Sequence, residues 1–240
     1  MNRLQQLVLA LVFLTRLPLG RFLPGRILPL AEAAWAFPVA GIIVGLIAAL
    51  PMWLLGGGLL PAALSVTLAI WLTGALHEDA LADFADAGGG RDTGDRLRIM
   101  RDSTVGSYGL AALICVTLLR VLALASTGPA ALVGAVAVGR VAPVVLMRAL
   151  PFARGDGLGQ QAGRPARDQL VIAAAIGLVA LMMTAPAPSG LILAIGCAIA
   201  AVVGVSRRAC RLVGGQTGDV LGAACLLVET AVLVGIACAM

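Results

Sequence analysis

The chain has 240 residues, of which 60 % are hydrophobic and only 12 % charged, and its mean hydropathy is +1.03. Soluble domains carry about twice that charged share, so the composition excludes an ordinary soluble domain and predicts a polytopic membrane protein. All 17 basic residues are arginine, against 12 acidic residues and a net charge of +5. No stretch is long enough to fold as a water-exposed basic domain, which excludes nucleic acid as a partner.

The N-terminus has a basic start and about a dozen apolar residues, a pattern typical of signal peptides. No small-x-small cleavage site follows it, and Arg16, Arg21 and Arg26 come directly afterwards. We therefore expect this segment to be retained as a helix that lies in, or re-enters, the membrane interface.

Seven apolar stretches of about 17 to 22 residues follow, each long enough to cross a hydrocarbon core about 30 Å thick as a helix. The predicted spans are 34–55, 59–76, 109–126, 131–149, 169–185, 190–206 and 219–239. Short turns without charge alternate with arginine-bearing loops, which the positive-inside rule places in the cytoplasm, with the C-terminus outside. The sequence thus predicts one all-α domain over residues 1–240, a polytopic membrane helical bundle of seven transmembrane helices plus the N-terminal helix.

An acidic run, LHEDALADFADAGGG at 76–90, interrupts this apolar sequence. Around a helix axis, Asp83 lies about 40° to one side of Asp79, and Asp86 lies about 20° to the other side of Asp79. The three carboxylates therefore share one face. Their repulsion weakens a helix by about 0.2 to 0.5 kcal/mol per pair, and water or a cation must compensate it. Hard oxygen ligands favour Mg²⁺ or Mn²⁺ over zinc. The alternative is a solvated helix whose acids balance nearby arginines.

The residues around this stripe add candidate groups for a diphosphate substrate. The glycines at 88–90 allow close backbone approach to phosphate, and Arg96, Arg98 and Arg101 offer guanidinium forks suited to it. His77 lies on the other side of the same helix, and it is either a general base or substrate donor or a structural hydrogen-bond partner.

Two further features involve polar groups near or inside the spans. In the run GGQTGDVLGA at 214–223, the backbone could cradle an anion at a helix N-terminus with Asp219 as another carboxylate, or Thr217 or Asp219 could be an ordinary N-cap. Arg120 and Arg140 sit well inside spans, where an ionised arginine costs at least about 2.5 to 3.5 kcal/mol unless it is partnered. Each should therefore face a polar cavity, toward an acidic residue or a substrate phosphate.

Taken together, these residues resemble the cobalamin synthase family, adenosylcobinamide-GDP ribazoletransferase. Five blocks occur in the family's order over nearly the full chain: FLTRLP (13–18), HEDALADFADA (77–87), IMRDSTVGSYG (99–109), PFARGDGLG (151–159) and GGQTGDVLGA (214–223). Ala80 and Ala87 depart from the pattern, because members usually have glycine there. Alanine narrows close backbone approach at these two positions.

The resemblance implies a transferase that joins adenosylcobinamide-GDP to alpha-ribazole, or to its 5′-phosphate, giving adenosylcobalamin, or its 5′-phosphate, and GMP, with magnesium required. This is phosphoryl-group transfer across a diphosphate, in which positioning and charge neutralisation supply most of the catalysis. It further implies a cell inner (cytoplasmic) membrane enzyme with its active site on the cytoplasmic side. A homo-oligomer is compatible with the sequence.

On this basis Asp79, Asp83 and Asp86 are expected to bind one or two Mg²⁺ ions that bridge the diphosphate. Asp83 or Asp86 is expected to take the proton of the attacking hydroxyl, with His77 as the competing base. The expected substrate-binding and supporting residues are Arg98, Arg101, Asp102, Arg140, Arg154, Thr217 and Asp219.

Two alternatives stay open on the sequence. Another membrane diphosphate-dependent transferase, such as a CDP-alcohol phosphotransferase, also uses clustered aspartates, although its usual motif has an AR pair and a longer spacer that 79–90 lacks. A cation-coupled transporter would also place acids and arginines within spans, but with helices broken at the midplane and paired repeats.

Overall fold

The computed structural model describes residues 2–24, 30–155, 160 and 162–240, and over these residues it contains helices and no β-sheet. Six helical segments are long and apolar enough to cross a membrane, and a bent helix pair makes a seventh if it counts as one span. The predicted all-α, polytopic fold is confirmed. The six segments are Leu30–Leu55, Ser107–Thr127, Pro129–Ala149, Arg167–Thr184, Pro188–Val213 and Gly218–Ala237.

Several of these segments are built from more than one helix. The first consists of η2 (Leu30–Ala36), α2 (Phe37–Ala48) and α3 (Leu50–Leu55). The third consists of α8 (Pro129–Gly139) and α9 (Val141–Ala149), which meet at Arg140. The other segments are single helices: α7 (Ser107–Thr127), α11 (Arg167–Thr184), α12 (Pro188–Val213) and α13 (Gly218–Ala237).

The predicted end of one span is wrong. Helix α12 continues to Val213, whereas the sequence pattern ended the span at 206 and assigned Arg207, Arg208 and Arg211 to a loop. Arginine is a good helix former, so a helix can continue past the point where its side chains become polar. Hydropathy marks where the apolar surface ends, which is not where the helix ends.

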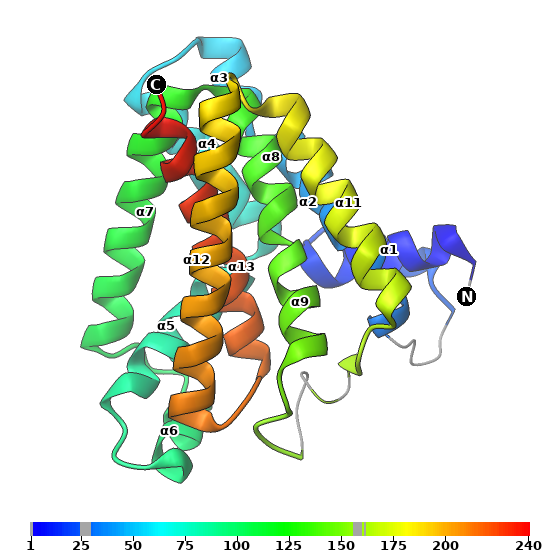
Figure 1. Cartoon of the computed structure of the whole chain (residues 1–240), viewed down its shortest axis with the longest axis vertical. Helices are drawn as coiled ribbons and strands as arrows, with labels where there is room; N and C mark the ends of the chain where they lie inside the picture. The colour runs from blue at the N-terminus through cyan, green and yellow to red at the C-terminus, as the bar shows by residue number, and fades with distance from the viewer. Residues whose placement is uncertain (1, 25–29, 156–159, 161) are drawn as a thin grey trace.

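The spans form an inner and an outer group. In α13 and in the α8–α9 segment, 72 % and 78 % of the apolar window is buried, whereas the share is 22–28 % in α7, α11 and α12. Figure 1 shows α12 and α7 on the outside of the bundle and α13 behind them. The outer helices expose large apolar side chains such as Leu118 and Ile192, which is the surface expected of a protein in lipid.

The second predicted span, 59–76, is broken. Helix α4 (Leu59–Thr73) ends at Gly74 and Ala75, both with positive φ, and α5 (Leu76–Asp86) leaves at an angle of 89°. Arg16 packs on this bend, because its amide donates to Leu72 O over 2.8 Å and its side chain lies where a Cβ on Gly74 would stand. The acidic helix therefore turns sideways into the bundle instead of extending α4.

The arginine-bearing connections lie together at one end of the bundle. Figure 1 shows α5, α6 (Thr93–Ile99) and the loop between α12 and α13 at the lower end, with the C-terminus and α3 at the upper end. Helix α1 (Arg3–Leu14) lies across the side of the bundle and packs against η2 and α2. The predicted N-terminal helix is thus present, and its place in a membrane interface stays a prediction.

Candidate active site at the arginine-bearing end

Helix α5 presents its aspartates on one face, as predicted. Asp79 is exposed and Asp83 and Asp86 are half-buried, while α5 packs against α13 and α7 with its other side. The buried residues on that side are His77, Glu78, Ala80, Leu81, Ala82 and Phe84. The 3.6-residue period thus separates a polar face from a packed face on the same short helix.

Carboxylates from three segments gather around Asp83. Its charge is opposed first by burial, and then by the charges of Asp79 and Asp86 on α5, Asp219 at the start of α13, and Asp102 in the loop before α7. We call these five residues the aspartate cluster. Such a concentration of negative charge attracts cations. No three His, Cys, Asp or Glu side chains in the described part of the chain converge closely enough to hold a metal ion, so the three-aspartate metal site stays a prediction.

Asp86 has a structural role that the sequence pattern did not indicate. Its two carboxylate oxygens accept hydrogen bonds from the amides of Gly106 and Gly109, each over 2.8 Å. These amides belong to the start of α7, where unpaired N–H groups and the helix dipole both favour an anion. Asp86 therefore ties α5 to the N-terminus of α7.

The two glycines make this contact possible. A Cβ on Gly106 would lie 2.6 Å from Asp86 Oδ1, and a Cβ on Gly109 would clash with Asp86 Oδ2 and lie 3.0 Å from Ala82 O. The glycines of the block at 99–109 are thus explained by the close approach of a carboxylate to a helix start.

Gly109→Ala is expected to destabilise the protein by about 1–3 kcal/mol, because the methyl group forces α7 away from Asp86. Gly196→Ala is the matched control, since Gly196 lies within α12 and a Cβ there meets nothing within 4 Å. That substitution should be neutral or stabilising by up to about 1 kcal/mol through helix propensity. Thermal unfolding in detergent measures both, and equal effects of the two changes would contradict the contact.

The block at 151–159 and the block at 214–223 meet through their backbones. Gln216 N donates to Pro151 O over 2.8 Å, and Ala153 N donates to Gln216 O over 3.0 Å. Thr217 Oγ1 accepts from Val220 N over 3.2 Å, so the alternative of Thr217 as N-cap of α13 is confirmed. This arrangement brings Arg154 Nη2 to 3.8 Å from Asp219 Oδ2. The rest of the first block, 156–159, lies outside the described residues.

A cavity of about 180 Å³ opens beside the aspartate cluster. Asp79, Asp219, His77 and Cys225 supply its charged and titratable side chains, and most of the lining is apolar. Its walls come from three of the five sequence blocks, through residues such as Phe13 and Gly222, and from α2 and α9. Residues more than 200 positions apart in the chain therefore share one wall.

One of the two departures from the family pattern is accommodated at this wall. Ala80 is 5 % exposed, and its Cβ lies where a Cβ on Gly222 of α13 would stand. A glycine on the facing helix thus makes room for the methyl group, and α5 and α13 still pack closely.

The predicted phosphate-binding arginines differ in their surroundings. Arg98 is exposed and pairs with Asp95 over 2.6 Å, and this hydrogen bond holds the pKa of Asp95 below its ordinary value. Arg101 and Asp102 are also exposed at the same end. Arg96 instead donates to the carbonyl oxygens of Gly90 and Leu212 over 3.1 and 3.2 Å, which gives it a structural role.

The glycines at 88–90 are also explained by packing. A Cβ on Gly88 would lie 2.6 Å from the guanidinium of Arg208, and one on Gly90 would lie 2.5 Å from the side chain of Arg96. These glycines therefore let two arginine side chains cross the backbone, a role different from the predicted approach to phosphate.

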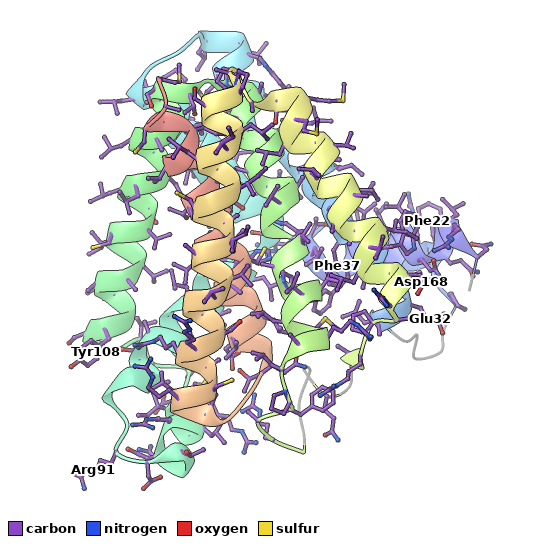
Figure 2. All side chains as sticks on the ribbon, viewed as in Figure 1. Phe22, Glu32, Phe37, Arg91, Tyr108 and Asp168 are labelled. Atoms are coloured by element: carbon purple, nitrogen blue, oxygen red, sulfur yellow. The ribbon has the colours of Figure 1, made fainter. Side chains whose placement is uncertain are left out.

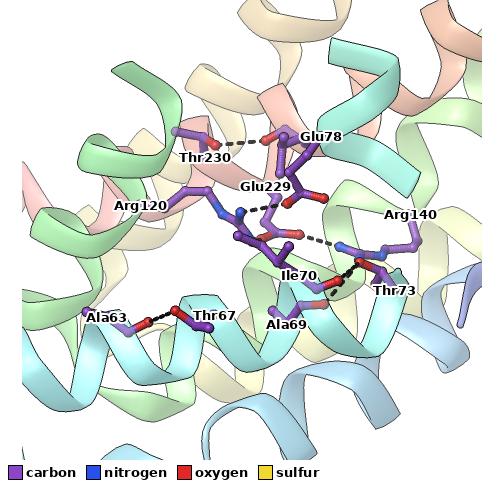
Figure 3. A network of polar contacts seen from close by, with 11 residues as sticks. Ala63, Thr67, Ala69, Ile70, Thr73, Glu78, Arg120, Arg140, Glu229 and Thr230 are labelled. Atoms are coloured by element: carbon purple, nitrogen blue, oxygen red, sulfur yellow. Dashed lines mark hydrogen bonds and ion pairs between the residues drawn. The ribbon is translucent and has the colours of Figure 1, made fainter. Parts of the chain in front are cut away.

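The two arginines inside spans bind acidic residues in the interior. Arg120 donates to Glu78 over 3.0 Å and to Glu229 over 2.7 Å, and Arg140 pairs with the other oxygen of Glu229 (Figure 3). These four residues, the buried ion-pair network, connect α5, α7, α13 and the α8–α9 junction. Of the two predicted alternatives, the acidic partner is the one found. Arg140 is 3 % exposed and pairs with Glu229, so its predicted contact with substrate stays a prediction.

Glu78 and Glu229 are the buried acidic partners that sequence reasoning missed. Glu229 is an acid deep within an apolar span, and two span arginines required partners, so the pairing had a signal in the sequence. Which acid meets which arginine depends on how the helices pack.

Fold and site together define a polytopic membrane protein with a carboxylate- and arginine-rich site at one end of its helical bundle. The family described as cobalamin-5-phosphate synthase matches residues 6–237. The chain belongs to this family, whose members are transferases of cobalamin biosynthesis.

Curated relatives agree with this assignment. Proteins named adenosylcobinamide-GDP ribazoletransferase include one from Azorhizobium caulinodans, 43 % identical over 224 residues that cover 86 % of this chain and 84 % of that protein. One from Bradyrhizobium diazoefficiens is 40 % identical, over 92 % of this chain and 89 % of that protein. One from Xanthobacter autotrophicus is 43 % identical, over 91 % of this chain and 90 % of that protein. No solved structure matches the chain.

Proposed function

We propose that this protein is a magnesium-dependent adenosylcobinamide-GDP ribazoletransferase of the cytoplasmic membrane, with its site on the cytoplasmic side. The observation that carries the proposal is the meeting of Asp79 on α5 and Asp219 on α13 at one cavity, with the guanidinium of Arg154 3.8 Å from Asp219. Carboxylates for a cation and guanidinium groups for phosphate are the two requirements of transfer across a diphosphate.

The residues present fit a magnesium ion by their chemistry. The aspartate cluster offers only hard oxygen donors, and the repulsion around Asp83 disfavours the cluster without a cation. Asp79 and Asp83 are the first candidates to hold Mg²⁺, with Asp86 as the predicted third. When bound, the ion would neutralise charge on the diphosphate.

The reaction forms one bond and breaks one. The 5′ hydroxyl oxygen of alpha-ribazole bonds to the phosphorus nearer cobinamide, the bond from that phosphorus to the GMP oxygen breaks, and GMP leaves. The hydroxyl proton passes to a carboxylate. Asp83 is favoured over Asp86 as that base, because both oxygens of Asp86 already accept backbone amides. His77, which lines the cavity, is the competing base.

The remaining residues bind and orient. Arg98 and Arg101 are exposed at the same end of the bundle as the aspartate cluster and would contact phosphate oxygens, with Asp102 next to Arg101 in the chain. Arg154 lies near Asp219 and would face the same diphosphate from the other side. Thr217 caps α13, and its hydroxyl donates to Asp219 Oδ2 over 3.2 Å, which orients that carboxylate.

Detergent-purified protein is expected to release GMP from adenosylcobinamide-GDP only when alpha-ribazole and Mg²⁺ are both present, and a chelator should abolish release. Chromatography of GMP and of the corrinoid product measures this. Release of GMP without the acceptor, or equal release in excess chelator, would overturn the proposal. Transfer from a CDP-alcohol in place of adenosylcobinamide-GDP would favour the neighbouring transferase class.

A further inference from the structure

The cavity beside the aspartate cluster has an uneven lining that points to a particular ligand. One part is formed by apolar side chains that include Phe13, Phe37 and Met147, and the other part carries Asp79 and Asp219. The rings of Phe13 and Phe37 lie nearly parallel, with centroids 6.2 Å apart and planes at 22°. A ligand that fills this space has an apolar, flat body and a polar end beside the carboxylates.

The size of the cavity limits the ligand further. A dry cavity of about 150 Å³ in a protein core binds benzene, so the 180 Å³ here suits an aromatic ring system of one or two rings. A corrin macrocycle is far too large for it. A guanine base would bury its carbonyl oxygen and ring nitrogens against apolar side chains, which costs free energy without hydrogen bonds.

We infer that this cavity is the binding site for the aromatic base of the acceptor nucleoside, with its ribose directed to Asp79 and Asp219. The inference rests on the proposed function, in which the acceptor is a ribonucleoside of a benzimidazole, a bicyclic and largely apolar base. The apolar part holds the base, and the 5′ hydroxyl then lies at the end of the cavity that Asp79 and Asp219 of the aspartate cluster line. His77, 3 % exposed on the cavity wall, can donate to or accept from a polar atom of the nucleoside.

Truncation of Phe13 tests this subsite. Phe13→Ala removes one apolar wall without touching the aspartate cluster, and the KM for alpha-ribazole should rise at least about tenfold while the KM for adenosylcobinamide-GDP changes less than about twofold. The dissociation constant of alpha-ribazole, measured by equilibrium dialysis without the donor, should rise in parallel. Phe13→Leu keeps part of the apolar surface, so its KM for alpha-ribazole should lie between those of the wild type and Phe13→Ala.

The matched control is Phe22→Ala. Phe22 belongs to the same N-terminal region but is 58 % exposed, and Figure 2 shows it on the outer side of the molecule while Phe37 lies within it. This variant should keep both KM values, and thermal unfolding of all variants separates loss of the subsite from loss of the fold.

An acceptor with a smaller base gives a second readout. Wild-type protein should prefer a benzimidazole riboside to an imidazole riboside, and Phe13→Ala should reduce that preference. The subsite would be overturned if Phe13→Ala changed the KM values of donor and acceptor equally, or left the preference between the two ribosides unchanged. It would also be overturned if activity depended on added lipid while the KM for the acceptor stayed the same. Failure of wild-type protein to use alpha-ribazole at all would instead overturn the proposed function.

Discussion

Asp83→Asn is expected to abolish GMP release, by about a thousandfold or more, and to leave the protein folded. The charge of Asp83 is opposed by its burial and by the other four carboxylates of the aspartate cluster, so a bound cation compensates it. Loss of a metal's electrostatic contribution costs several kcal/mol of transition-state stabilisation, and each 1.36 kcal/mol is about tenfold in rate. Steady-state assays of GMP release measure the loss.

The same substitution should not weaken the metal-free protein. Asparagine keeps the shape of the side chain and removes repulsions of about 0.2 to 0.5 kcal/mol per neighbouring carboxylate, so thermal unfolding in a chelator should occur at the wild-type temperature or above it. Mg²⁺ should raise the unfolding temperature of the wild type and have much less effect on the variant, because a ligand of the folded state stabilises by mass action.

Asp168→Asn is the control for this prediction. Asp168 is exposed in the first turn of α11, and Figure 2 shows it well apart from Tyr108, which marks the start of α7 beside Asp86. The Asp168→Asn variant should retain both the release of GMP and the rise in unfolding temperature that Mg²⁺ causes. Near-normal turnover of Asp83→Asn, or loss of its fold in a chelator, would exclude Asp83 from the role proposed here.

The sequence predicted the ends of a span well where glycine or a capping residue marks the end of the helix. The predicted ends of α7 and α13 differ from the observed ends by at most two residues, and glycine marks both ends of α7 while Thr217 marks the start of α13. The break between α4 and α5 was not predicted, because Ala75 carries no signal for a positive φ and the packing of Arg16 on Gly74 is a contact between distant parts of the chain.

The site was predictable to a similar degree. The common face of Asp79, Asp83 and Asp86 follows from helix periodicity alone. The use of Asp86 as a cap for α7, and the meeting of Asp79 with Asp219, depend on how three helices pack, which no local pattern encodes. Motif order can show that blocks belong together, but the structure is needed to divide their residues between binding and support.

Glu229→Ala is expected to destabilise the protein by about 3–5 kcal/mol. Glu229 is 1 % exposed and accepts from both Arg120 and Arg140, so its loss leaves two buried guanidinium groups without their shared partner. Both arginines lie within spans, where lipid and packed helices offer no water to replace the carboxylate. Unfolding in detergent with increasing denaturant, together with the yield of membrane-inserted protein, measures the effect. Glu32→Ala, an exposed acid in η2, should change stability by less than about 0.5 kcal/mol.

A double substitution separates charge balance from packing. The buried ion-pair network holds two carboxylates and two guanidinium groups, so changing Arg140 and Glu229 together to methionine leaves Arg120 paired with Glu78 and no net charge in the interior. Replacing a whole buried pair with apolar residues of similar volume is often neutral, whereas removing one partner is not. The double variant should therefore be more stable than Glu229→Met alone by more than about 1 kcal/mol. Additive losses would mean that Glu229 acts by filling space, and α5 would then owe its position to packing against α13 and not to the ion pairs that reach it through Glu78.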